Sequence, residues 1–173
     1  EKLVLRGINM QQRGFTLIEL IIVIVILGIL AVTAAPRFID FQSDARASTL
    51  QGLKAGLQGG SQLVYAKSAI AGSQGIAATT VSINGTTVNI NYGYPDADTM
   101  LLTGTPTISA WTDITDTDWD AVVTTAGDQT SSPEVAGVIT FYPEGTTDNT
   151  CAVTYTEATD SGVPSVALVD TGC

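Results

Sequence analysis

The apolar residues of the chain are concentrated near its N-terminal end. The run from Phe15 to Ala35 is almost continuously hydrophobic and carries a single charged residue, Glu19. As an α-helix rising about 1.5 Å per residue, this run would be roughly 30 Å long, which is the thickness of the hydrocarbon core of a bilayer. The pattern therefore predicts a helix that can cross a membrane.

The helical pattern continues beyond Pro36 in amphipathic form. Apolar residues recur at helical spacing, at Ile39, Leu50, Leu53, Leu57 and Val64. We predict one helix from Phe15 to about Lys67. Its first half needs a cover of lipid or of other subunits, whereas its second half can lie on a folded domain. Gly28 and Pro36 are the weak points, because glycine lowers helix propensity by about 1 kcal/mol relative to alanine and proline removes a backbone hydrogen bond.

Three glycines, Gly52, Gly56 and Gly60, are spaced by four residues and so lie on one face of this helix. Small residues on a helix face allow another backbone to approach closely. A membrane dimer motif is one interpretation. The polar neighbours Lys54 and Gln58 favour the other, which is packing against a sheet.

Strand patterns begin at Thr79, where β-branched runs alternate with turn residues. Residues 79–92 predict a hairpin, in which Asn84 and Gly85 supply the positive φ angles of a type I′ turn. Further strands are predicted within 134–143, 151–158 and 164–170. A long N-terminal helix packed on a mostly antiparallel β-sheet places the chain in the α+β class, with the arrangement of an αβ-roll.

Charge is segregated along the chain. All Lys and Arg residues lie at or before Lys67, whereas residues 68–173 carry thirteen Asp and Glu and no basic residue. A segment of this composition cannot bind nucleic acid through phosphate contacts, so we exclude that partner for the acidic part. Surface acidity is also typical of a soluble exported domain.

The cysteine count indicates an exported protein. Cys151 and Cys173 are the only two cysteines, and such a pair predicts one disulfide, the alternative being two reduced buried thiols. The chain contains no histidine. It therefore lacks zinc ligands, the usual general base and a Ser-His-Asp arrangement, and we predict a non-enzyme without a cofactor.

One acidic stretch is a weak candidate for a metal site. Alternate acids in this stretch could supply oxygen ligands to Ca²⁺: Asp113, Asp116, Asp118 and Asp120. The glycine and glutamate that an EF-hand loop needs are missing at the corresponding positions. A solvated acidic turn is the preferred interpretation.

The N-terminal residues resemble a known family. Arg13 and Gly14, followed by FTLIEL and a long aliphatic run, resemble the leader and mature N-terminus of type IV prepilins. This resemblance implies cleavage between Gly14 and Phe15 by a prepilin peptidase, N-methylation of Phe15 and assembly into a pilus fibre. Glu19 matches the glutamate that neutralises the terminal amine of a neighbouring subunit. The stretches VIVILGILAVTAAPRF, QSDAR and TLQGLK are similar to the mannose-sensitive haemagglutinin pilins of marine gamma-proteobacteria.

The resemblance also implies a division of the chain. We expect a leader peptide at 1–14, of which 1–9 reads as an upstream extension of the frame, and a hydrophobic membrane and fibre-core helix at 15–36. An amphipathic helix half follows at 37–67 and an acidic β-rich head at 68–173. The segment from Gly28 to Pro36 is expected to be helical in the free subunit and extended in the fibre.

The expected function is that of the major structural subunit of a type IV pilus used for surface attachment or biofilm formation. The expected partners are copies of itself in a helical homopolymer, the prepilin peptidase and N-methyltransferase, and the pilus assembly machinery. The precursor would lie in the inner membrane of a Gram-negative bacterium before it joins an extracellular fibre. Two alternatives are the major pseudopilin of a type II secretion system and a secreted soluble domain behind an ordinary signal peptide.

Overall fold

A computed structural model describes residues 14–100, 102 and 108–173, with the side chains of 35–40 left out. The predicted leader at 1–14 therefore lies outside the described residues, except for Gly14. Contacts divide the chain into two units, one that ends at Gln42 and one from Ser43 to Cys173. The predicted α+β class is confirmed, because a long N-terminal helix is followed by antiparallel sheets.

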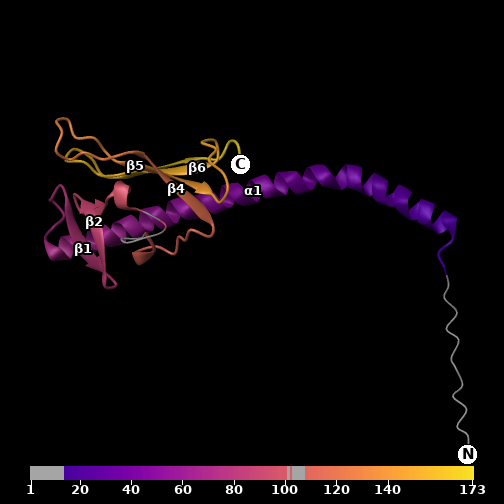
Figure 1. Cartoon of the computed structure of the whole chain (residues 1–173), viewed down its shortest axis with the longest axis horizontal. Helices are drawn as coiled ribbons and strands as arrows, with labels where there is room; N and C mark the ends of the chain where they lie inside the picture. The colour runs from indigo at the N-terminus through magenta and orange to yellow at the C-terminus, as the bar shows by residue number, and fades with distance from the viewer. Residues whose placement is uncertain (1–13, 101, 103–107) are drawn as a thin grey trace, which may run out of the picture. The chain divides into compact units, whose positions relative to one another are not determined.

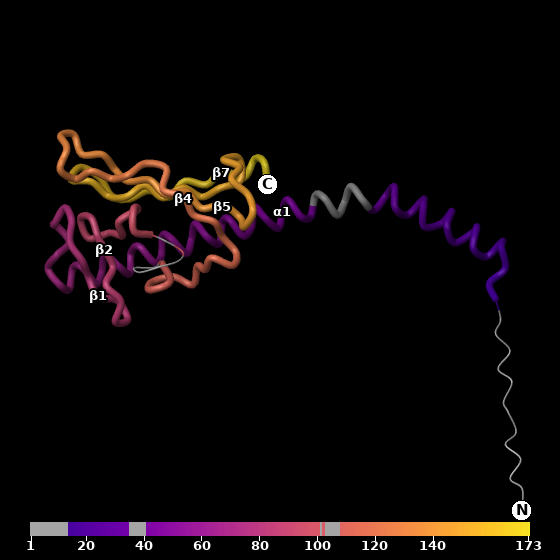
Figure 2. Tube along the Cα trace, in the orientation of Figure 1, coloured from indigo at the N-terminus to yellow at the C-terminus, as the bar shows by residue number. Residues whose placement is uncertain are grey.

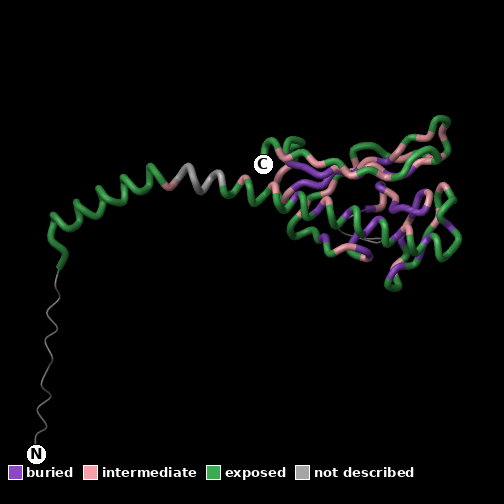
Figure 3. Tube along the Cα trace, turned by 180° about the vertical axis from the view of Figure 1, so that it is seen from behind, coloured by how far each residue is buried: buried purple, intermediate pink, exposed green. Residues whose placement is uncertain are grey.

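The helix α1 runs from Leu17 to Ala71 and begins and ends close to the predicted bounds. Its N-terminal part is exposed along its length (Figure 3), and the side chains from Leu17 to Leu30 are at least half exposed wherever they are large and apolar. The segment Leu17–Ala34 has a mean hydropathy of 3.0, and it is long and apolar enough to cross a membrane. No described residue outside the helix covers its apolar surface.

The first sheet of the second unit has three antiparallel strands in the order β1 (Thr79–Ile83), β2 (Thr86–Asn91) and β3 (Tyr94–Pro95). The predicted hairpin is confirmed, since Asn84 and Gly85 have φ angles of 50° and 82°. Strand β3 was not predicted. A second two-residue turn, Tyr92 and Gly93 with φ angles of 50° and 89°, joins it to β2. The short helices η1 (Ala97–Thr99) and η2 (Ile108–Ala110) follow.

The second sheet has four antiparallel strands in chain order: β4 (Trp119–Thr125), β5 (Val138–Pro143), β6 (Ala152–Thr156) and β7 (Ser165–Val169). The strand β7 lies at one edge and leads to the C-terminus (Figure 2). The last three strands were predicted and β4 was not. Trp119 and Asp120 had been assigned to an acidic turn, but they begin β4, because the β-branched residues that follow them form a strand paired with β5.

The core of the second unit lies between α1 and the two sheets, and the C-terminal part of α1 runs alongside both of them (Figure 1). The predicted helix positions Leu50, Leu53, Leu57 and Val64 are all buried. They pack with side chains from both sheets, including Ile83, Ile90, Phe141, Val153 and Tyr155. The side chain of Ile39 lies outside the described ones.

The glycine face of α1 is only partly packed. A Cβ atom added at Gly60 would collide with the side chains of Trp111 and Thr112, so another segment does approach the helix there. A Cβ at Gly52 or Gly56 would have no heavy atom within 4 Å. Close packing thus occurs at one of the three glycines, and the segment that packs there is the loop after η2 rather than a sheet, as had been predicted.

The disulfide between Cys151 and Cys173 is formed, with its Cα atoms 4.9 Å apart. It links the residue before β6 to the segment that follows β7. The prediction of a disulfide is confirmed, and the alternative of two reduced thiols is wrong.

Candidate processing and assembly site

The residues on either side of the predicted cleavage point lie just before α1. Gly14 and Phe15 have no helical or strand structure, and the Phe15 side chain is 89% exposed. A peptidase needs an accessible, extended backbone at the bond that it cuts. The Gly14–Phe15 bond is exposed and lies outside any helix or strand, so it meets the first of these requirements.

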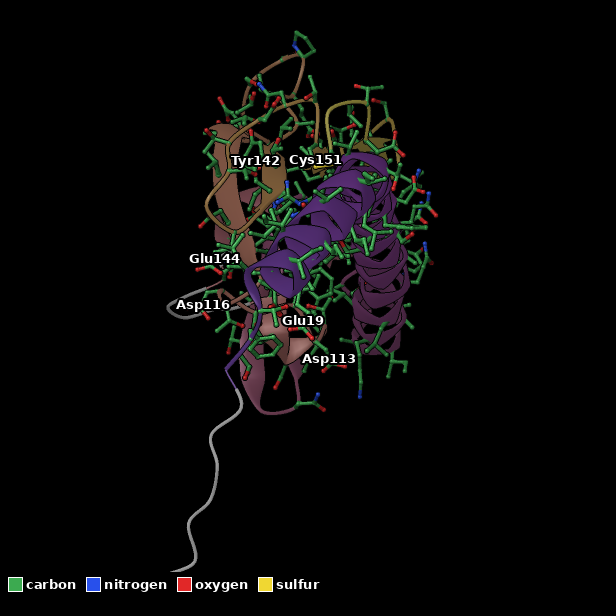
Figure 4. All side chains as sticks on the ribbon, turned by 90° about the vertical axis from the view of Figure 1, so that its right-hand side faces the viewer. Glu19, Asp113, Asp116, Tyr142, Glu144 and Cys151 are labelled. Atoms are coloured by element: carbon green, nitrogen blue, oxygen red, sulfur yellow. A yellow bond between two sulfur atoms is a disulfide. The ribbon has the colours of Figure 1, made fainter. Side chains whose placement is uncertain are left out.

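Glu19 lies in the first turn of α1 (Figure 4) and takes part in a capping box with Thr16. The backbone N–H of Thr16 donates to Glu19 Oε2 at 2.8 Å, and the Thr16 hydroxyl donates to the same oxygen at 2.7 Å. The backbone N–H of Glu19 lies 3.3 Å from Thr16 Oγ1. These bonds satisfy backbone N–H groups that the first turn of a helix leaves unpaired.

The sequence interpretation of Glu19 missed this local role. The signature was present, because threonine followed three residues later by glutamate, ahead of an apolar run, is the capping-box pattern. The carboxylate is thereby held at the positive end of the helix dipole, beside the position where cleavage after Gly14 would create an amine. Both side-chain bonds use Oε2, and no donor among the described residues reaches Oε1. One oxygen is therefore available to a cation.

The two predicted weak points of the helix lie within α1. The backbone is helical at Gly28 and at Pro36, while the Pro36 side chain is not described. A Cβ at Gly28 would meet no atom within 4 Å. The predicted loss of helix in this segment concerns the assembled fibre and stays a prediction.

The four candidate calcium ligands lie in the segment that leads into β4 and at its start, and Figure 4 labels Asp113 and Asp116. Asp120 Oδ2 accepts a hydrogen bond of 2.9 Å from Gly145 N, and Asp118 lies 3.4 Å from the Thr115 hydroxyl. Within the described part of the chain, no three His, Cys, Asp or Glu side chains are placed to hold a metal ion together. The structure thus adds no support for a calcium site.

A buried carboxylate that sequence reasoning did not single out joins the two sheets. Glu157 is 3% exposed, and its Oε2 accepts hydrogen bonds from Asn91 Nδ2 at 2.9 Å and Ala97 N at 3.0 Å. Its Oε1 accepts from Gln129 Nε2 and Gly137 N, both at 2.6 Å. These donors come from β2, η1 and the segment before β5. Glu157 therefore fixes separate parts of the second unit to one another.

Asp96 lies close to this carboxylate and caps η1 by accepting a 2.9 Å hydrogen bond from Asp98 N. Burial raises the pKa of Asp96 to about 6, and the charges of Glu157 and Asp98 act in the same direction against the hydrogen bond from Asp98 N. No sequence pattern marks this pair, because its members are brought together only by the packing of the two sheets.

Comparison with known proteins gives one family match at the N-terminal end of the chain and several partial matches to relatives. The prokaryotic N-terminal methylation motif matches residues 9–35. The type IV major pilin protein PilA of Myxococcus xanthus is 58% identical over 40 residues, which are 23% of this chain and 18% of that protein. The narrow pilus major component PilA5 of Thermus thermophilus is 47% identical over 49 residues, 28% of this chain and 42% of PilA5.

A longer match is found with the fimbrial protein EcpC of Eikenella corrodens, which is 40% identical over 82 residues, 45% of this chain and 52% of EcpC. The chain thus spans about half or less of each of these relatives. No solved structure matches. Over the parts that match, the chain is therefore similar to type IV pilins, which are structural, non-enzymatic proteins, and its long N-terminal helix packed against antiparallel sheets is consistent with their fold.

Proposed function

We propose that this chain is the major structural subunit of a type IV pilus. The observation that carries the proposal is the exposed apolar segment Leu17–Ala34, which has Glu19 in its first turn and follows an accessible Gly14–Phe15 bond. Such a surface is stable in lipid, or in a fibre core where identical helices cover one another. The membrane provides the first environment before assembly, and polymerisation provides the second.

The mechanism follows from the geometry at the start of α1. A prepilin peptidase cuts after Gly14 and creates an α-amino group on Phe15, which is then N-methylated. The Thr16 N–H and hydroxyl are not touched by this cut, so the capping box persists. The free oxygen of Glu19 pairs with the Phe15 amine of a neighbouring subunit as the subunit leaves the membrane. A subunit that joins out of register leaves the Glu19 carboxylate unpaired in an apolar surrounding, and this raises the free energy of the misplaced arrangement.

The finer assignment is to the mannose-sensitive haemagglutinin type of pilin, on the strength of the three stretches that resemble it. The precursor would lie in the inner membrane of a Gram-negative bacterium, and the pilus assembly machinery would extract it. The fibre would serve surface attachment or biofilm formation. A pseudopilin would share the N-terminus, and the presence of long sheared fibres at native expression levels separates a pilin from it.

The test is mass spectrometry of fibres sheared from cells. An N-terminal peptide that begins with methylated Phe15 supports the proposal, whereas a mature chain that begins at Pro36 or Arg37 would indicate a secreted domain and exclude it. Glu19→Ala should leave cleavage after Gly14 intact and abolish or weaken assembly. Thr16→Ala is the matched control, since it removes the N-cap, at about 1 kcal/mol of helix stability, but keeps the carboxylate. Abundant fibres from the Glu19→Ala chain would contradict the pairing role.

A further inference from the structure

The described head contains a groove with an aromatic wall. Its volume is about 630 Å³, and it lies between the C-terminal end of α1, the turn between β2 and β3, and the loop 158–163. The rings of Tyr65 and Tyr94 stack at the groove with their centroids 4.6 Å apart. Tyr92, at the tip of the turn, also lines it. The wall of the groove therefore contains aromatic rings from two different elements, of which Tyr65 and Tyr92 are partly exposed and Tyr94 is buried.

Two carboxylates accompany these rings. The Tyr92 hydroxyl donates to Glu134 Oε1, and the backbone N–H of Asp160 donates to Glu134 Oε2 at 3.0 Å. Glu134 thus joins the turn on one side of the groove to the loop on the other, and Asp160 itself lines the groove. Tyr92 has a φ angle of 50°, which is unfavourable for a bulky residue and is more often occupied by Asn or Gly in such a turn. The fold thus places an aromatic side chain at this edge at a cost in backbone energy.

Aromatic faces beside carboxylates attract a cation, since the negative face of each ring and the two acids act in the same direction. The surroundings strengthen this preference, because residues 68–173 carry no Lys or Arg. Lys67 lies two residues after Tyr65 on α1. At about 100° per residue, its side chain therefore projects from nearly the opposite face of the helix. No basic side chain of the described head is therefore placed to fill the groove of its own subunit.

The basic residues of the second unit, Arg46, Lys54 and Lys67, all belong to α1. Arg46 is exposed, makes no ion pair with the described residues, and lies 19 positions before Tyr65, about 28 Å along the helix. Lys54 is half-buried. A guanidinium is also better suited than an ammonium to stack on aromatic rings and to bind carboxylates with two hydrogen bonds.

We propose that the tyrosine groove of one copy receives Arg46 of a second copy. The groove and Arg46 lie toward opposite ends of the same unit, so the contact joins unlike surfaces and can be repeated from copy to copy into an open helical fibre. This inference rests on the proposed function, since it names a contact between subunits of the proposed pilus. It gives the acidic head a cationic partner that a homopolymer can supply.

The test is charge reversal in cells that express the full chain, with the ratio of sheared fibre to cell-associated subunit as the readout. Arg46→Glu and Asp160→Arg should each reduce this ratio at least about tenfold, because each places like charges opposite one another in the contact. The double variant should recover most of the loss. Asp148→Arg, which reverses an exposed acid that does not line the groove, is the matched control and should change the ratio little.

A cysteine pair gives a second measurement. In fibres of the chain that carries both Arg46→Cys and Asp160→Cys, oxidation should give a ladder of multimers on non-reducing gels, whereas each single variant should give dimers at most. Absence of fibres from the unmodified chain would refute the proposed function itself. Normal fibres from both reversal variants, or single losses that the double variant does not recover, would overturn the contact while leaving the proposed function intact.

Discussion

Removing the charge of Asp96 should stabilise the head at neutral pH. The substitution Asp96→Asn keeps an oxygen to accept the hydrogen bond from Asp98 N, so the cap of η1 remains. It removes a carboxylate that is partly buried beside Glu157 and Asp98, the cause of the raised pKa. The change therefore separates the effect of the charge from that of the cap.

The size of the effect follows from the pKa. A rise from 3.8 to about 6 means that the folded state holds a proton which the unfolded state has released at intermediate pH. Protonated Asp96 therefore contributes its full share to the stability of the folded state below about pH 4, and this contribution is lost as the pH rises toward about 6. The full shift corresponds to about 3 kcal/mol, and screening of this half-buried side chain reduces it to about 1 to 2 kcal/mol.

The assay is urea denaturation of the full chain in nonionic micelles, followed by tryptophan fluorescence, since Trp111 and Trp119 both lie in the second unit. The unmodified chain should lose stability between about pH 4 and 6, whereas Asp96→Asn should lose less and be about 1 to 2 kcal/mol more stable at neutral pH. Asp113→Asn removes one exposed negative charge and controls for general repulsion. If Asp96→Asn and Asp113→Asn are equally stable at neutral pH, the gain does not come from the burial of the Asp96 charge, and the reasoning is refuted.

Three further changes can be measured in the same assay. Glu157→Gln places an amide NH₂ against backbone and side-chain donors, and the lost hydrogen bonds should cost about 3 kcal/mol; a neutral result would show that the carboxylate is not the joint between the sheets. Gly60→Ala should destabilise the fold by about 1 to 3 kcal/mol, because its Cβ would collide with neighbouring side chains. Gly52→Ala, where the added Cβ has space, should stabilise the fold by about 0.5 to 1 kcal/mol. Equal effects of the two changes would contradict the close packing at Gly60. Replacing Cys151 and Cys173 by serine should lower the free energy of unfolding by about 3 kcal/mol, because the unfolded chain is no longer constrained by the closed loop. An unchanged midpoint of urea unfolding would contradict this stabilising role of the disulfide.

The short-range periodicity of the sequence was enough to predict most of the main elements. Leu50, Leu53 and Leu57 follow a helical repeat, and the pair Asn84–Gly85 permits few structures other than a tight hairpin turn. These features are local, since each is decided by residues a few positions apart. The strand β4 was missed because the acids before it dominate the composition of the segment, while its pairing with β5 depends on residues some twenty positions away.

The candidate site was predictable to the extent that its chemistry lies in consecutive residues. Gly14, Phe15 and Glu19 were proposed from one short stretch and stay a prediction, and the capping role of Thr16 could have been found there too. The environment of Glu157 could not, because its donors are 20 to 66 positions away in sequence. Neither could the tyrosine groove, where a turn that no pattern predicted brings Tyr92 beside the end of the helix.

Two carboxylates of the chain are satisfied in contrasting ways, and the contrast bears on what each is for. Glu157 is buried and accepts hydrogen bonds on both oxygens from its own chain, so it contributes to the folding of a single subunit. Glu19 is exposed and is bonded through one oxygen to Thr16, while no described residue supplies a donor to the other. A carboxylate in an apolar segment is costly in lipid, and capping alone could be done by an uncharged glutamine, which also occurs in capping boxes. If the proposed pairing of the Glu19 carboxylate with an amine is right, Glu19→Gln, which keeps the cap and loses the charge, should fail in assembly as Glu19→Ala does.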